Sequence, residues 1–187
     1  MTNSTFASAA DSALVLIDVQ ERLMAAMEPA ISQAVLRNAE ILVKSASSLG
    51  IPVLATEQYP KGLGRTVAEL AALLPPGAPR IEKTSFSCAG VNAFSTALKA
   101  TGRSQVILAG TESHVCVLQS ALDLLAAGKT VFVVEDATCS RKIANRENAM
   151  NRLRCAGVVV TNVESVVFEW LRDASNASFR ALSALLR

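Results

Sequence analysis

Three residues carry a carboxylate, an amine or a thiol that could take part in catalysis. Two of them lie at the ends of short segments of strand length, and the third lies in a polar turn before a helix. Asp18 follows the run ALVLI, Lys83 ends the segment RIEK, and Cys116 lies in the turn GTESHVC. A thiol can attack a carbonyl carbon, a carboxylate can carry the thiol proton to a leaving amine, and an ammonium can stabilise the thiolate. Nearby helix N–H groups and Lys83 are expected to lower the pKa of Cys116. The three types together indicate covalent hydrolysis of a carbonyl compound.

Each of these residues also has an ordinary structural interpretation. A cysteine is commonly a small core hydrophobe, an aspartate after a strand often caps a helix, and Lys83 can be a solvated loop residue. The single histidine, His114, lies two residues before Cys116, and this spacing does not bring side chains face to face on a helix. We therefore expect His114 to shape the pocket or the turn rather than to form a catalytic pair with the thiol.

Neighbouring segments are candidates for the walls of a substrate pocket. The polar loop TEQYPKGLG follows an apolar run, and loops after strands commonly carry binding residues. We expect Gln58, Tyr59, Phe86 and His114 to line the pocket. Asp136, which follows the run VFVV, is expected to hold the loop of residues 138–141. A plain surface loop is the alternative for TEQYPKGLG.

The elements that must position these residues alternate in type along the chain. Apolar runs of strand length are separated by stretches with helical spacing, and the expected strands cover residues 13–17, 51–56, 80–83, 105–109, 130–134 and 158–161. Continuously apolar strands between helices predict a parallel sheet with helices on both faces. We predict an α/β fold, a three-layer α/β/α sandwich with a six-stranded parallel sheet of Rossmann-like type. Ligands of such folds bind at the carboxyl ends of the strands.

Length and composition narrow the class of protein. The 187 residues suit one domain, which we expect over residues 13–187 after a flexible lead-in of residues 1–12. The net charge is only +2 and no Lys or Arg run occurs, so nucleic-acid binding is not expected. No membrane span or secretory signal is predicted. The four cysteines form no CxxC pair, so we expect reduced thiols, a cytoplasmic location and no metal or other cofactor.

The segments LVLIDVQ, EKTSFS and AGTESHVCVLQSALDLLAAGKTVFVVEDA resemble the isochorismatase-like cysteine hydrolases. The resemblance extends from about residue 13 to residue 170. It implies that Cys116 is the nucleophile, Asp18 the general acid/base and Lys83 the third member of a catalytic triad. It also implies a cis peptide at Thr111–Glu112, and an oxyanion hole formed by the N–H groups of Glu112 and Cys116. TEQYPKGLG and the segment CSR resemble the subgroup called isochorismatase-domain-containing proteins.

The resemblance also carries expectations about substrate and assembly. Nicotinamidases of this family use an Asp-x-His motif and further histidines to bind a metal, whereas this chain has Glu57-Gln58-Tyr59 there. Isochorismatases proper lack the cysteine, so the chain is expected to cleave a small amide or other C–N bond. Family members commonly form dimers, tetramers or larger assemblies, and the apolar residues of the last helices are compatible with an interface: Val166, Val167, Trp170 and Leu171. A binding or scaffold protein and a redox-sensing thiol protein are the alternatives.

Overall fold

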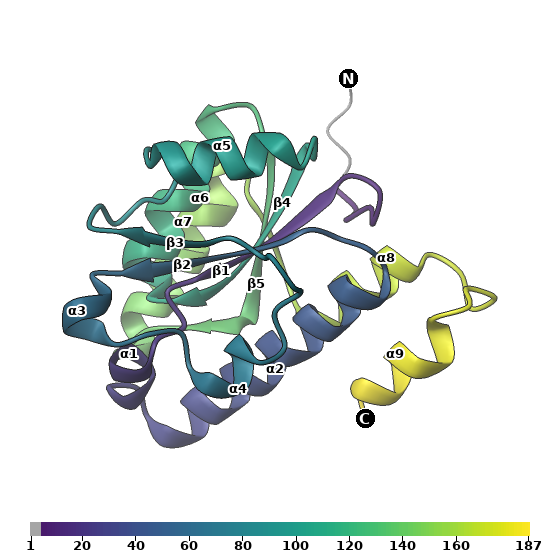
Figure 1. The fold of residues 1–187 in the computed structure, drawn as a ribbon, viewed down its shortest axis with the longest axis horizontal. Helices are drawn as coiled ribbons and strands as arrows, with labels where there is room; N and C mark the ends of the chain where they lie inside the picture. Colours follow the sequence, from purple (N-terminus) through teal and green to yellow (C-terminus); the bar gives the residue numbers. More distant parts are fainter. Residues whose placement is uncertain (1–4) are drawn as a thin grey trace.

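A parallel six-stranded sheet runs through the middle of the computed structural model, which describes residues 5–187 (Figure 1). The strand order is β3-β2-β1-β4-β5-β6, so the chain begins at the sheet centre and builds outward in both directions. The strands are β1 (Ser12–Ile17), β2 (Val53–Gln58), β3 (Arg80–Lys83), β4 (Gln105–Thr111), β5 (Thr130–Cys139) and β6 (Val159–Thr161).

Helices cover both faces of the sheet. Strand β1 shows why, because Leu14 and Leu16 pack into one apolar cluster while Val15 and Ile17 pack into the other. The first cluster joins α1 (Glu21–Ala25), α2 (Pro29–Ser48), α4 (Ala68–Ala71), α8 (Val163–Leu171) and α9 (Phe179–Leu185). The second joins α5 (Asn92–Ala100), α6 (Leu118–Ala126) and α7 (Ile143–Ala156). Figure 1 shows these two groups on opposite sides of the strands. The remaining short helices are α3 (Pro60–Leu63) and the π-helical turn η1 (Ser113–Val117).

The three-layer α/β/α sandwich with six parallel strands is confirmed. Strand β5 continues to Cys139, past the predicted end at residue 134, because it resumes pairing with β4 after an irregularity between Leu108 and Gly110. The expectation that Asp136 holds residues 138–141 is wrong. Its carboxylate instead accepts the N–H of Val163 at 2.9 Å, at the start of α8.

The expected interface residues of α8 face the interior. Val166, Val167, Trp170 and Leu171 are buried in the chain's own core, where the Trp170 indole N–H donates to the Ser12 hydroxyl at 3.0 Å. The interpretation of these four side chains as an oligomer surface is therefore wrong. Their apolar character is explained by packing against α2 and the sheet.

The amino-terminal segment is only partly described. Residues 1–4 of the expected lead-in lie outside the described residues, while Ala7 is buried and its N–H donates to the Glu169 carboxylate. The division into a lead-in and a single domain stays a prediction. Across residues 5–187, no helix combines the length and the apolar character that crossing a membrane requires.

Candidate active site

Asp18 directly follows β1 and lies beside the end of β4. Its backbone has a positive φ of 49°, which Asp tolerates better than most residues, and its carbonyl accepts the Thr111 hydroxyl at 2.7 Å. Gly110 of β4 allows this approach, since a Cβ there would meet the Ile17 carbonyl oxygen at 1.9 Å. Glycine at this position therefore brings the end of β1 against the turn that carries Cys116.

The carboxylate of Asp18 is fully buried and has a partner on each oxygen. Oδ1 accepts the Thr56 hydroxyl at 2.6 Å, and Oδ2 lies 2.7 Å from the Lys83 ammonium. Both Asp18 and Lys83 have side chains with 0% exposure. The sequence predicted Thr111 only as part of the cis peptide, and it did not predict that the hydroxyls of Thr56 and Thr111 bind Asp18. The signal for Thr56 was its polar type directly after the apolar residues of β2, two residues before Gln58.

Lys83 ends β3, the strand next to β2, and its ammonium points back toward β1. Besides Asp18, it donates to the Gln58 side-chain oxygen at 2.7 Å and to the carbonyls of Ser85 and Phe86 at 3.2 and 3.1 Å. A buried ammonium requires this many acceptors, because its hydration is lost. The expected alternative, a solvated lysine in a loop, is wrong for Lys83.

Cys116 completes the cluster from the other side of β1. Its thiol lies within hydrogen-bonding reach of Asp18 and Lys83, and the residue is 6% exposed. Burial and the Asp18 carboxylate raise the pKa of Cys116 to about 12, and the opposing charge of Lys83 is too small to reverse this. The expectation of a lowered pKa is therefore wrong. The resting residue is a thiol, and a base must remove its proton during attack.

The turn before Cys116 contains the peptide bond Thr111–Glu112, which is cis. The Glu112 carboxylate is nearly buried and accepts hydrogen bonds from the Arg141 backbone N–H at 3.0 Å and from the Arg141 guanidinium at 3.1 Å. Burial raises the pKa of Glu112, but the hydrogen bonds and charge of Arg141 outweigh it and lower the pKa. The carboxylate thus anchors the turn to the end of β5. The oxyanion hole formed by the Glu112 and Cys116 N–H groups stays a prediction.

His114 faces the segment after β5. Its Nδ1 lies 3.0 Å from the Ser140 hydroxyl, and its Nε2 lies 3.2 Å from the Asn145 side-chain nitrogen. With the amide donating to Nε2, the proton of the neutral ring is on Nδ1. Both ring nitrogens are therefore engaged away from Asp18 and Lys83. Direct contact of His114 with a substrate stays a prediction.

A cavity of about 450 Å³ opens beside Lys83, between the loop after β2 and the loop after β3. Tyr59 and Pro60 line one side, and Thr84, Ser85 and Val91 line the other. Tyr59 and Phe86 are 54% and 52% exposed, so both flank the site at the protein surface. Their contact with substrate stays a prediction, as does that of Gln58, which is nearly buried.

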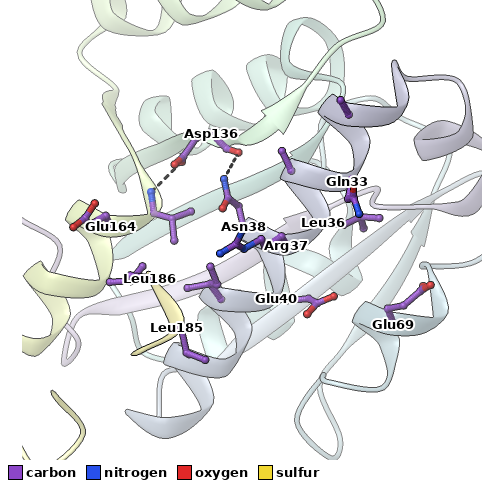
Figure 2. Close-up of a pocket in the computed structure, with 14 residues that line it drawn as sticks. Gln33, Leu36, Arg37, Asn38, Glu40, Glu69, Asp136, Glu164, Leu185 and Leu186 are labelled. Atoms are coloured by element: carbon purple, nitrogen blue, oxygen red, sulfur yellow. Dashed lines mark hydrogen bonds between the residues drawn. The ribbon is translucent and has the colours of Figure 1, made fainter. Parts of the chain in front are cut away.

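A larger cavity of about 860 Å³ lies on the opposite layer, along α2 (Figure 2). Figure 2 shows Asn38 of α2 donating to the Asp136 carbonyl, at 2.7 Å, next to the bond between Asp136 and Val163. The first two-thirds of α2, Glu69 of α4, the start of α8 and the end of α9 form the rest of its lining. Its lining contains neither a cysteine nor a lysine, so Cys116 and the larger of the two cavities are in different places.

Glu57, the residue matching the metal-binding motif of nicotinamidases, faces away from Asp18. Its carboxylate accepts the Thr66 N–H and hydroxyl at 2.9 and 2.8 Å and pairs with Arg65 at 2.9 Å. Strand alternation explains this direction, because Thr56 and Gln58 point to the opposite side. Within residues 5–187, no three His, Cys, Asp or Glu side chains are arranged so that they could hold a metal ion.

A family profile and individual relatives in other organisms match this chain, and they agree on one protein family. A sequence profile described as the isochorismatase domain matches residues 12–165. Isochorismatase domain-containing protein 2 of Danio rerio is 40% identical over 94% of this chain and 86% of its own length. Isochorismatase domain-containing protein 1 of Salmo salar is 37% identical over 91% of this chain, which spans only 59% of the salmon protein. The secreted isochorismatase effector Isc1 of Phytophthora sojae is 37% identical over 94% and 84% of the two chains.

Solved structures share the fold closely. A Caenorhabditis elegans protein described as MAR1 ribonuclease has a TM-score of 0.90 and 34% identity over 96% of this chain and 91% of its own. The ycaC product of Escherichia coli, described as an octameric hydrolase of unknown specificity, has a TM-score of 0.90 and 30% identity over 98% and 90%. YcaC of Pseudomonas aeruginosa, solved with covalent acrylamide, has a TM-score of 0.87 and 30% identity over 97% and 90%.

Proposed function

Because the chain belongs to the isochorismatase family of hydrolases, we propose that it cleaves a small amide, or a similar C–N bond, through a covalent intermediate on Cys116. The observation that carries the proposal is the buried meeting of a thiol, a carboxylate and an ammonium at the carboxyl ends of β1, β3 and β4. A nucleophile, a proton carrier and a fixed positive charge are the groups that acyl transfer to sulfur requires.

The reaction begins with proton transfer. The Cys116 sulfur attacks the amide carbon while its proton passes to the Asp18 carboxylate, since a pKa of about 12 leaves almost no free thiolate at neutral pH. The C–N bond then breaks, and Asp18 returns the proton to the leaving amine. Water attacks the resulting thioester and gives a proton to Asp18, the C–S bond breaks, and the carboxylic acid and the free thiol are released.

Lys83 stabilises the charges that this sequence moves. Its ammonium lies 2.7 Å from Asp18 and within hydrogen-bonding reach of the sulfur, so it faces the negative charge on either partner. The N–H groups of Glu112 and Cys116 are proposed to bind the oxyanion of the tetrahedral intermediate. The substrate is proposed to enter past Tyr59 and Phe86 and to contact Gln58 and His114. No bound cofactor is needed for these steps.

The raised pKa of Cys116 favours the hydrolase over the redox-sensing alternative. Cysteines that react readily with peroxide are accessible and have low pKa values, whereas Cys116 is buried and has a pKa of about 12. An amide substrate brings its carbonyl into the site and can be attacked as Asp18 takes the proton.

The test is an acid-quenched incubation with a panel of small amides, read by intact mass and by amine release. We expect a thioester on Cys116, and we expect Cys116→Ala to lose turnover completely. Cys139→Ala is the matched control, because Cys139 is also buried with a pKa of about 12 but its charged neighbours are Glu112 and Arg146. Turnover retained by Cys116→Ala overturns the mechanism. Stable binding of a partner that is independent of Cys116, without any acyl adduct, supports the scaffold alternative.

Assembly and location belong to the same proposal. We propose a homo-oligomer, a dimer or a tetramer, and the E. coli relative, which is described as octameric, supports self-assembly as such. Light scattering coupled to size-exclusion chromatography measures this directly. The cytoplasmic location stays a prediction, since the Phytophthora relative is named a secreted effector. Absence of nucleic-acid binding also stays a prediction, and because the C. elegans relative is described as a ribonuclease, RNA belongs in the substrate panel.

A further inference from the structure

The Lys83 ammonium has more acceptors than it has protons to donate. Its three N–H groups face Asp18 and Gln58 at 2.7 Å each, the carbonyls of Ser85 and Phe86 at 3.2 and 3.1 Å, and the Cys116 sulfur. The two shortest bonds go to side-chain oxygens. Gln58 is therefore as close a partner of the ammonium as the Asp18 carboxylate is.

These acceptors respond differently to the proposed proton transfer. When Asp18 takes the thiol proton, its carboxyl becomes neutral and attracts the ammonium less strongly. The Gln58 oxygen and the two backbone carbonyls carry no proton and do not change. They can hold the ammonium beside the sulfur at the moment when negative charge develops there. Among these unchanging acceptors, only Gln58 acts through its side chain.

The orientation of Gln58 is itself fixed. Its side-chain nitrogen donates to the Thr84 carbonyl at 2.7 Å, which turns the oxygen toward Lys83. Its backbone N–H donates to the Gln20 side-chain oxygen at 2.7 Å, and the Gln20 nitrogen donates to the carbonyls of Gln58 and Gly64 at 3.0 and 2.7 Å. Gln20 is fully buried, and these bonds tie both ends of the loop after β2 to the segment between β1 and α1.

We propose that Gln58 is a positioning residue, which keeps the Lys83 ammonium beside the Cys116 sulfur while the charge of Asp18 is cancelled. This inference rests on the proposed function. Both polar ends of the Gln58 side chain are already engaged, by Lys83 and by Thr84, so its effect is on the reaction rate rather than on substrate affinity. It differs from the pocket role expected from the sequence, in which Gln58 contacts the substrate directly.

The probe for this inference is p-nitrophenyl acetate. Acylation forms a bond between the Cys116 sulfur and the acetyl carbon, breaks the ester C–O bond, places the thiol proton on Asp18 and releases p-nitrophenolate, which is measured by absorbance. The limiting acylation rate and the half-saturating ester concentration are measured separately for wild type, Gln58→Met, Gln58→Asn and Gln20→Met. Gln33→Met, an exposed site on α2, is the control, and the melting temperature of every variant is recorded.

We expect Gln58→Met to lower the limiting rate about 10- to 100-fold, the effect of losing one hydrogen bond to a charged group, with the half-saturating concentration unchanged within about twofold. Gln58→Asn, whose oxygen is withdrawn by one methylene, is expected to show an intermediate loss. Gln20→Met loses three bonds of the same network but none to Lys83, so it lowers the melting temperature while acylation falls less than about threefold.

Two results would overturn the inference. Equal losses of rate in Gln58→Met and Gln20→Met would assign Gln58 a merely structural role, and Gln58→Asn gives the same comparison if the methionine variant does not fold. A raised half-saturating concentration at an unchanged limiting rate would make Gln58 a substrate contact instead. Either of these two results leaves the proposed function intact, provided that the wild type is acylated at Cys116. Failure of wild type to acylate, with its mass unchanged, overturns the proposed function and this inference together.

Discussion

Buried carboxylates lie on both sides of the carboxyl end of β2, and they have different partners. On one side of β2, Thr56 and Gln58 serve Asp18 and Lys83, whose side chains have no exposure. On the other side, Glu57 is buried to the same degree, but its cation is Arg65, which is 64% exposed. The difference lies in what remains reactive, because the Asp18 carboxylate also reaches a thiol, whereas Glu57 is satisfied by a backbone N–H, a hydroxyl and a guanidinium.

The contrast teaches that burial of a charge does not by itself mark a catalytic group. The Glu57 carboxylate holds the segment of Arg65 and Thr66 in place, and these partners favour its ionised form. The Asp18 cluster brings a carboxylate, an ammonium and a thiol together, and in the proposed mechanism a proton moves between them. Separate substitutions on the two faces should therefore separate activity from stability.

Breaking the buried pair should have the largest effect. Asp18→Asn removes the proton carrier and leaves a buried ammonium unpaired, so we expect acylation by p-nitrophenyl acetate to fall at least about 1,000-fold and stability to fall by about 3–5 kcal/mol. Lys83→Met should cost similar stability. The double variant should be more stable than the sum of the single losses predicts, as measured by chemical denaturation. Simple additivity would show that the two side chains are not coupled.

The protonation of Cys116 gives the second largest effect. Because its pKa is raised to about 12, alkylation by iodoacetamide should keep accelerating from pH 7 to pH 10 without a plateau. The Lys83 charge lowers the pKa of Cys116, so Lys83→Met should slow alkylation at every pH in this range, by about tenfold. Glutathione is the reference thiol, and peptide mass mapping identifies the alkylated cysteine. A plateau near pH 7 in wild type would contradict the raised pKa.

Glu57→Gln tests the opposite face, where stability should change and acylation should not. Burial raises the pKa of Glu57, but hydrogen bonds from Thr66 and Arg65 outweigh it and lower the pKa below 4.5. A carboxylate with a lowered pKa stabilises the folded state above pH 4.5, and this stabilisation is lost as the pH falls further. We expect a loss of about 1–3 kcal/mol at pH 7 that shrinks below pH 4.5, measured by urea denaturation.

The acylation rate of Glu57→Gln should stay within about threefold of wild type, since its carboxylate contacts neither Lys83 nor Asp18 through the bonds described above. A hundredfold loss of acylation with unchanged stability would reverse the comparison and assign Glu57 to the active site.

The smallest effect is expected at the exposed end of the same network. Glu82 is 55% exposed and pairs with Arg65, and exposed ion pairs add little to stability in water. Glu82→Gln should change the melting temperature by less than about 2 °C, and added salt should remove the difference. A change as large as that of Glu57→Gln would show that Arg65 relies equally on both carboxylates.

Much of the fold followed from local pattern. Apolar runs marked the strands other than β3, whose sequence RIEK has one apolar residue. The position of Asp18, Lys83 and Cys116 at strand ends predicted that they would meet. The same reasoning failed for Asp136 and for the apolar residues of α8, because apolar character alone does not say which surface covers a side chain. Val167 and Trp170 read as a possible interface, yet they complete the chain's own core.

The sequence by itself determined the three-layer architecture and the residue types of the candidate site, because periodicity and chemistry are local properties of the chain. Only the tertiary structure decided the state of the Cys116 thiol, since its pKa depends on burial and on the Asp18 carboxylate, which is distant in sequence. It also decided that Gln58 faces Lys83 while Glu57 faces Arg65. Hydrogen bonds between separate strands fix these directions, and no local pattern contains them.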